Sequence, residues 1–288
     1  DDETGLVYYN YRYYSPELGR WIKRDPIGEE GGVNPYAMVG NNPITEMDQL
    51  GYSLWGEIVY PTIDDVTDIP PVMRANDMLV GATLMEKWFS TKSNKSKMFV
   101  TDVVTMEWAK KFARFKKVYD DILKQKLYLN RAAQKEIIRI AKKNNAYAMG
   151  GVFGAVEGDI TMLDKDYVQH RSVGAMSDPL DDMYAALGVF NLRVLVNGKV
   201  INSSFPRTFC IKKIGLYIQD SYDFNGRQHL GYWDIAKKRV YKQPFLGGAL
   251  VTNGDFREYR DRTGYGHDFI VFSDIEVIDL GEGERFSE

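Results

Sequence analysis

The sequence has very little cysteine and no long apolar run. Cys210 is its one cysteine among 288 residues, which excludes an internal disulfide framework and a cysteine-based zinc cluster. Its neighbours, RTFCIKKIGLYI, favour a buried strand position over a nucleophile. No stretch approaches the roughly 20 apolar residues that cross a bilayer, and the first residues lack a signal-peptide core. The motifs of serine hydrolases, HExxH zinc proteases and P-loop ATPases are also missing.

An excess of charge of either sign is missing too. The chain has 37 Lys and Arg against 40 Asp and Glu, a net charge of -3, so the whole molecule gives no reason to expect nucleic-acid binding. Residues 108–143, however, hold twelve Lys or Arg and three Asp or Glu. This local excess predicts either a surface that follows phosphate or an anionic membrane, or simply two solvated helix faces.

The opening segment, residues 1–51, differs in composition from the rest. It is dense in Tyr, Gly, Asn and Pro. GLVYYNYRYYSP alternates in the manner of strands, while SPELG, GEEGG and GNNP have turn chemistry. We therefore predict short strands joined by tight turns, with a domain boundary at Gly51–Ser53 where ordinary globular sequence begins.

The second segment, residues 52–288, divides again into two halves. Residues 52–145 contain three stretches with apolar residues every three or four positions, NDMLVGATLMEKWF, TMEWAKKFARFKKVYDDILKQKLYLN and RAAQKEIIRIAKK, which predict helices. Residues 146–288 alternate as strands do, and Asn197-Gly198 predicts a tight hairpin turn. The expected fold class is α+β: a helical N-terminal half packed on an antiparallel β-sheet or partly open β-barrel, preceded by the β-rich opening segment.

The opening residues resemble a known border sequence. ETGLVYYNYRYYSPELGRWIKRDPIG followed by NPYAMVGNNPITEMDQLG is similar to the C-terminal end of the Rhs/YD-repeat core. In that family a β-strand cocoon encloses a variable C-terminal toxin. The resemblance implies that residues 1–51 are a core remnant and that residues 52–288 are the toxin, which themselves resemble an uncharacterised Rhs-associated domain.

The same resemblance implies self-cleavage at the border by aspartyl-protease-like chemistry, in which two adjacent carboxylates share a proton. The matching positions are Arg24, Asp25 and Asp48, and cleavage would release the domain near Gly51–Ser53. The second motif departs from the family, because Gln49 stands where a turn-setting proline is usual. The alternative to self-cleavage is that Asp25 and Asp48 only cap turns.

A strand-end loop, LYIQDSYDFNGRQHLGYWD, gathers most of the candidate catalytic side chains. They are Asp220, Tyr222, Asp223, Asn225, Arg227 and His229. Carboxylates beside a histidine can bind a divalent metal or share acid and base roles. The spacing resembles the colicin M active-site motif, although Leu230 stands at the family's arginine. That resemblance implies Mg²⁺-assisted hydrolysis of lipid II, the peptidoglycan precursor. Asp220 and Asp223 would hold the metal or activate water. An Asx-rich turn is the alternative.

A second candidate cluster lies in GDFREYRDRTGYGHDFIVFSD. Here Arg257, Arg260 and Arg262 precede His267 and Asp268. The arginines could face phosphate, and His267 with Asp268 forms a second catalytic candidate if this strand adjoins the Asp220 loop. A salt-bridged turn is the alternative interpretation.

Together these features predict an antibacterial Rhs-type effector for interbacterial competition, delivered by a secretion apparatus such as type VI into a target cell. The periplasm is the favoured compartment and the cytoplasm the alternative. The expected enzyme is a hydrolase acting on a lipid-linked phosphate. A nuclease acting on nucleic acid and a membrane-disrupting or pore-forming toxin are the alternatives. The expected partners are a cognate immunity protein and the rest of the Rhs core cocoon.

Overall fold

A computed structural model describes residues 4–9, 12–24, 34–38, 65–226, 228–242 and 248–288 and, for His229, the backbone alone. The described residues fall into two compact units. One comprises the described residues up to position 38 together with 248–250, and the other comprises 65–242 and 251–288 with their gap at 227. Arg24 is exposed in the first unit. Asp25, Asp48, the boundary at Gly51–Ser53 and Arg227 lie outside the described residues.

The first unit holds a small antiparallel sheet of three short strands, β1 (Val7–Tyr8), β2 (Tyr13–Ser15) and β3 (Arg20–Trp21). Trp21 is fully buried, with the Tyr9 ring edge-on at 5.0 Å and the Arg12 guanidinium 4.3 Å above it. The prediction of short strands joined by tight turns is confirmed for these residues.

The second unit is a mixture of helices and strands. Its described helices are α1 (Ile69–Ala75), α2 (Leu79–Ser90), α3 (Met106–Ala109), α4 (Ala113–Lys124), α5 (Arg131–Lys143), α6 (Ile160–Leu163), α7 (Asp182–Leu187) and α8 (Asn253–Thr263). Its strands are β4 (Phe99–Val100), β5 (Val152–Phe153), β6 (Gln169–Val173), β7 (Phe190–Asn202), β8 (Thr208–Tyr222), β9 (His229–Asp234), β10 (Arg239–Tyr241), β12 (Phe269–Phe272) and β13 (Glu276–Ser287). The strand β11 (Ala249–Thr252) begins in residues assigned to the first unit and ends in residues assigned to the second.

The predicted helices form where their apolar periodicity placed them. α5 begins after Asn130, whose side chain accepts a hydrogen bond from the Ala133 N–H, and it ends at Asn144. The long helix expected over residues 105–130 is interrupted at Phe112, so that α3 and α4 are separate. The division into a helical and a strand half is only approximate, because β4 lies in the first half and α6, α7 and α8 lie in the second.

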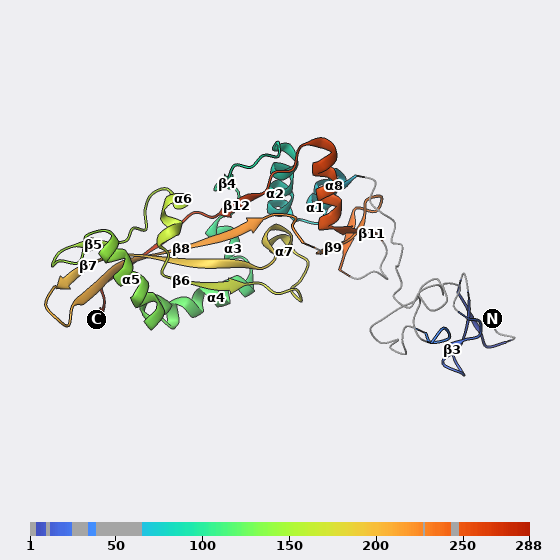
Figure 1. The fold of residues 1–288 in the computed structure, drawn as a ribbon, viewed down its shortest axis with the longest axis horizontal. Helices are drawn as coiled ribbons and strands as arrows, with labels where there is room; N and C mark the ends of the chain where they lie inside the picture. Colours follow the sequence, from blue (N-terminus) through green and yellow to red (C-terminus); the bar gives the residue numbers. More distant parts are fainter. Residues whose placement is uncertain (1–3, 10–11, 25–33, 39–64, 227, 243–247) are drawn as a thin grey trace. The chain divides into compact units, whose positions relative to one another are not determined.

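A seven-stranded sheet organises the second unit, and its two longest strands, β7 and β8, run side by side in Figure 1. Most of its pairs are antiparallel, as predicted, but β12 and β4 pair in parallel, with Ile270 opposite Phe99. β12 pairs with the end of β8, with Phe269 opposite Tyr222. The sequence segments that contain the two candidate clusters therefore lie next to each other.

The expected hairpin turn at Asn197-Gly198 is wrong. β7 continues through these residues, and the register to β8 shifts between Asn197 and Gly198 as a β-bulge. The turn lies farther on, between Asn202 and Thr208. Glycine is needed at position 198 because a Cβ there would lie 2.3 Å from the Cys210 carbonyl oxygen and 2.6 Å from the Phe153 ring.

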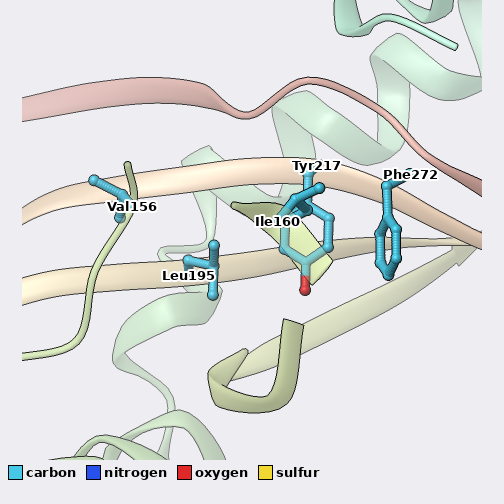
Figure 2. Packing of buried hydrophobic residues seen from close by; sticks show 5 residues of the cluster. All are labelled: Val156, Ile160, Leu195, Tyr217 and Phe272. Carbon is cyan, nitrogen blue, oxygen red and sulfur yellow. The ribbon is translucent and has the colours of Figure 1, made fainter. Parts of the chain in front are cut away.

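Both faces of the sheet are covered by helices. On one face Leu195 of β7 and Tyr217 of β8 pack with Ile160 of α6, together with Val156 and Phe272 (Figure 2). On the other face Phe115 of α4 stacks on Phe190 of β7, with ring centroids 6.3 Å apart. Successive strand residues alternate between two apolar layers, so the sheet is a rigid support for the loop that follows β8.

Candidate functional site

The candidate loop begins at the carboxyl end of β8, where alternate side chains point to opposite sides of the sheet. Asp220 and Tyr222 lie on one side, opposite Val271 and Phe269 of β12, and Ser221 lies on the other, opposite Ile270. The Asp223 carboxylate accepts a hydrogen bond from the Ser221 hydroxyl at 2.9 Å, which places it on the Ser221 side. The two aspartates therefore lie across the end of the strand from each other.

Asp220 is the most electrostatically perturbed acid of the loop. Burial of its carboxyl, reinforced by the nearby negative charge of Asp223, raises the pKa of Asp220 to about 8, although the Ser221 backbone N–H partly compensates the charge. The residue as a whole is half-buried. A carboxyl group that keeps its proton near neutral pH can act as a general acid.

Tyr222 belongs to the core. It is buried, and its ring stacks on Phe269 at 4.9 Å and meets Phe224 edge-on at 5.6 Å. Burial, and secondarily the charge of Asp220, raises the pKa of the Tyr222 hydroxyl above its ordinary value. In this arrangement Tyr222 packs the loop against the sheet, as the turn interpretation of this sequence requires.

The rest of the loop is a turn fixed by α8. The Asp223 carboxylate accepts a hydrogen bond from the Asn225 N–H at 3.0 Å, an Asx turn. Arg257 of α8 donates hydrogen bonds to the carbonyl oxygens of Phe224 and Gly226, at 2.7 and 2.8 Å. Phe224 stacks on Phe256 of α8 at 3.8 Å. Asn225 is exposed, and His229 is the first residue of β9.

His267 and Asp268, from the second cluster, join the end of α8 to β12. His267 is only 4% exposed, and both ring nitrogens have backbone partners: Nδ1 accepts from the Asn94 N–H at 3.2 Å, and Nε2 lies 3.0 Å from the Ser96 carbonyl oxygen. Because Nδ1 accepts a hydrogen bond, the ring hydrogen is on Nε2, which donates it to Ser96, and the ring is neutral. His267 anchors the segment before β4 and has no free nitrogen for acid or base chemistry.

Asp268 orients an arginine. Its Oδ1 accepts hydrogen bonds from Trp88 Nε1, at 2.9 Å, and from Arg260 of α8. The Arg260 guanidinium also lies 5.1 Å from the Trp88 ring centroid. An ion pair and an aromatic surface thus hold this guanidinium in place, while its buried Nε has no hydrogen-bond partner.

A pocket of about 210 Å³ opens beside these residues. Residues 93–98 form one wall, and the ends of β8 and β12 together with Arg260 of α8 supply the rest of the lining. The lining residues are Ser93, Asn94, Ser96, Lys97, Met98, Ser221, Arg260, His267, Asp268, Phe269 and Ile270. The pocket contains Arg260, His267 and Asp268 of the second predicted cluster. From the strand that carries the first cluster it contains Ser221 but no predicted site residue, and it adds a segment that sequence reasoning missed.

The signal for that missed segment is STKSNKSKM, residues 90–98, in which three lysines alternate with serine and asparagine just before a short strand. Small polar residues between lysines are a composition that suits an anion-binding loop. Its place beside His267 depends on the parallel β4–β12 pairing, which local sequence patterns do not specify.

Five acids from other elements pair with basic residues of the stretch 108–143. Lys110 pairs with Glu276, Arg114 with Asp178 and Asp181, and Lys126 with Glu284. Arg139 and Lys143 pair with Asp166. The local charge excess of the sequence is therefore much reduced in the folded domain, which favours the solvated-helix interpretation.

A Mg²⁺ site was predicted at Asp220 and Asp223. Within the described part of the chain, no group of three or more His, Cys, Asp or Glu is arranged to hold a metal ion. Two carboxylates on either side of a strand end are fewer ligands than a protein-only Mg²⁺ site uses, although Mg²⁺ often binds one or two carboxylates together with substrate phosphates. Mg²⁺ stays a prediction for the substrate complex.

Among the described helices, none is long and apolar enough to span a membrane.

Comparison with protein families identifies the second unit. Residues 65–245 and 237–287 match the model of a family of unknown function, DUF6402. The chain belongs to the DUF6402 family. The match includes the β8 loop, the pocket and α8, so the candidate site lies within the DUF6402 domain. No solved structure matches the chain.

Curated relatives share only a short segment. The chain is 52% identical over 50 residues to toxin subunit YenC2 of Yersinia entomophaga, 17% of this chain and 5% of that protein. It is 51% identical over 51 residues to toxin protein Tse5 of Pseudomonas aeruginosa, 18% of this chain and 4% of that protein. It is 47% identical over 51 residues to double-stranded DNA deaminase toxin A of Burkholderia cenocepacia, 18% of this chain and 4% of that protein.

These matches are about as long as residues 1–51, on which the Rhs resemblance rests. They support an Rhs-associated C-terminal toxin region. The chain spans about a twentieth of the length of these relatives. The colicin M resemblance gains no support from these matches.

Proposed function

We propose that this chain is the C-terminal part of an Rhs-type antibacterial toxin and that its DUF6402 domain is the toxic part. The observation that supports this is a short segment shared with several toxins in a chain whose residues 65–245 and 237–287 match DUF6402. By this proposal the domain is released by self-cleavage near Gly51–Ser53 and delivered to a target cell. A cognate immunity protein protects the producer.

For the chemistry we propose hydrolysis by the carboxyls at the end of β8. Asp220, with a pKa of about 8, would be the general acid that protonates a leaving oxygen. Asp223 would be the base that activates water. The two carboxyls lie on opposite sides of the end of β8, so this proposal requires a substrate that lies across the strand end. His267 has no acid or base role in this proposal, since its ring nitrogens are both engaged.

The target of this hydrolase is lipid II in our first proposal, on the colicin M-like spacing of Asp220, Asp223 and His229. Nucleic acid is the second candidate, and the cationic side chains beside the pocket, Lys97 and Arg260, favour it equally well. The two targets lie in different compartments, so localisation of toxicity separates them.

The test is to express residues 1–288 in bacteria, directed either to the cytoplasm or to the periplasm. Wild type is compared with Asp220→Asn and Asp223→Asn, which keep side-chain shape, and with Asp234→Asn in β9 as the matched control. We expect killing by wild type and the control, and a loss of at least 100-fold with either active-site variant.

Toxicity restricted to the periplasm would support lipid II, and toxicity restricted to the cytoplasm would support nucleic acid. Killing that persists in both Asp220→Asn and Asp223→Asn would overturn the hydrolase and favour a membrane-disrupting toxin. No toxicity of wild type in either compartment would contradict the assignment of a toxin domain.

A further inference from the structure

The pocket beside β12 is too small for a whole substrate. Its volume of about 210 Å³ lies below the roughly 300–1,000 Å³ of sites that enclose a drug-sized ligand. At about 30 Å³ per water molecule, it has room for a compact polar group with a few waters. The pocket is therefore suited to one substituent of a larger molecule that extends out of it.

Its lining is polar and carries a positive charge. Lys97 and Arg260 are cationic, and Asp268 is the one acid among the lining residues. Asp268 is already engaged by Trp88 and Arg260, while the His267 ring is neutral. One positive charge therefore remains uncompensated. The exposed side chain of Lys97 has no ion pair with any described residue.

Several residues that line this pocket are held in place before any ligand arrives. Arg260 forms an ion pair with Asp268, and its guanidinium lies 5.1 Å from the Trp88 ring centroid. The opposite wall is fixed by the two His267 hydrogen bonds and by a bond of 2.8 Å from the Ser96 N–H to the Asn94 side-chain oxygen. Preorganised donors lower the free energy that a ligand must supply to order its site.

From this geometry we infer that the pocket is a phosphate-binding subsite, in which Arg260 and Lys97 hold a phosphate or diphosphate group of the substrate. A guanidinium fork and a lysine ammonium are the side chains that recognise phosphate oxygens. The hydroxyl of Ser93 on the same wall can donate a further hydrogen bond to those oxygens, whereas the hydroxyl of Ser96 already donates to the Asn94 side-chain oxygen.

The subsite lies on the Ser221 side of β8, the side to which Asp223 is tied by its hydrogen bond. Of the two proposed catalytic carboxyls, Asp223 is therefore the one on the side of the subsite. The inference deepens the proposed hydrolase function and rests on it, because only a hydrolase would bind this phosphate as part of a substrate. Phosphate binding itself can be measured without any catalytic activity.

The experiment is calorimetric titration of the purified chain, residues 1–288, with inorganic diphosphate at low salt. We expect one saturable site in wild type. Lys97→Gln removes one charge-assisted contact at an exposed position and should weaken binding about tenfold. Arg260→Lys should weaken it as well, because the fork is lost while the charge is kept.

Lys117→Gln, an exposed lysine of α4 away from the pocket lining, is the matched control and should bind as wild type does. Thermal melting of each variant establishes that it is folded. If Arg260→Lys does not fold, the binding of diphosphate by Lys97→Gln alone tests the subsite. An absence of saturable binding to wild type, or an equal loss in Lys97→Gln and Lys117→Gln, would overturn the subsite.

Competition then separates the sources of the phosphate. Vesicles that contain a diphosphate-linked polyprenyl lipid and a short single-stranded DNA are each added to the diphosphate complex. Displacement by one of them identifies the substrate class, and displacement by neither means that the pocket is not a substrate subsite. If diphosphate binds but the chain kills no cell, the subsite stands and the toxin proposal fails.

Discussion

At the residue scale, Asp220 makes the stability of the domain depend on pH. Its pKa is about 8 in the folded chain against an ordinary value of 3.8. Between these values the folded state binds one proton more than the unfolded state, so stability falls as pH rises from about 4 to about 8. This contribution is complete below pH 4 and is lost above pH 8.

Replacing Asp220 by asparagine should remove that dependence. We expect Asp220→Asn to have nearly the stability of wild type at pH 4 and to be more stable than wild type at pH 8, on the order of a few kcal/mol. Urea denaturation at a series of pH values measures the free energy of unfolding of both proteins. Asp234→Asn is the control, because the pKa of Asp234 is shifted downward by hydrogen bonds from Lys237. A wild-type profile with the same slope as Asp220→Asn would refute the assignment.

At the element scale, the β7–β8 pair depends on the bulge at Gly198. We expect Gly198→Ala to destabilise the domain by about 1–3 kcal/mol, because the added Cβ has no space between the Cys210 carbonyl and the Phe153 ring. Lys199→Ala, one residue along the same strand and exposed, should change the stability by less than about 0.5 kcal/mol. Chemical denaturation compares them, and equal effects would show that the bulge is not constrained.

The elements also show what could be read from the sequence. Helices with a broad apolar face, such as α5 with Ile137 and Ile140, were predictable from periodicity. α8 was not, because Phe256 is its one buried large apolar residue. Its capping box, Thr252 with Asp255, and Gly264 at its end were local signals of a helix. Asn-Gly favours a turn only where no partner strand continues past it, and β8 continues.

The candidate site followed the sequence in part. Asp220 and Asp223 were predicted as site residues because they are close in the sequence, at the end of one strand and in the loop that follows it. The pocket was not found as a unit, because Lys97 and Arg260 are brought together only by the parallel pairing of β4 with β12. The catalytic role expected of His267 depended on a free nitrogen, and only tertiary hydrogen bonds to Asn94 and Ser96 decide that question.

At the scale of the whole molecule, the proposed release of the DUF6402 domain can be tested on a gel. Purified wild-type chain should yield a second band of the size of residues 52–288, whereas Asp25→Asn and Asp48→Asn should remain intact, because each removes one carboxylate of the proposed pair. Mass spectrometry of the product locates the bond. Identical full-length bands for all three proteins would contradict self-cleavage by this chain.

The parallel pairing of β4 with β12 has a consequence for biosynthesis. Val100 and Val271 are neighbours in the sheet, yet 170 intervening positions are translated between them, and contacts so distant in sequence form late and slowly. A chain on the ribosome therefore lacks part of the pocket lining until the residues of β12 have been translated.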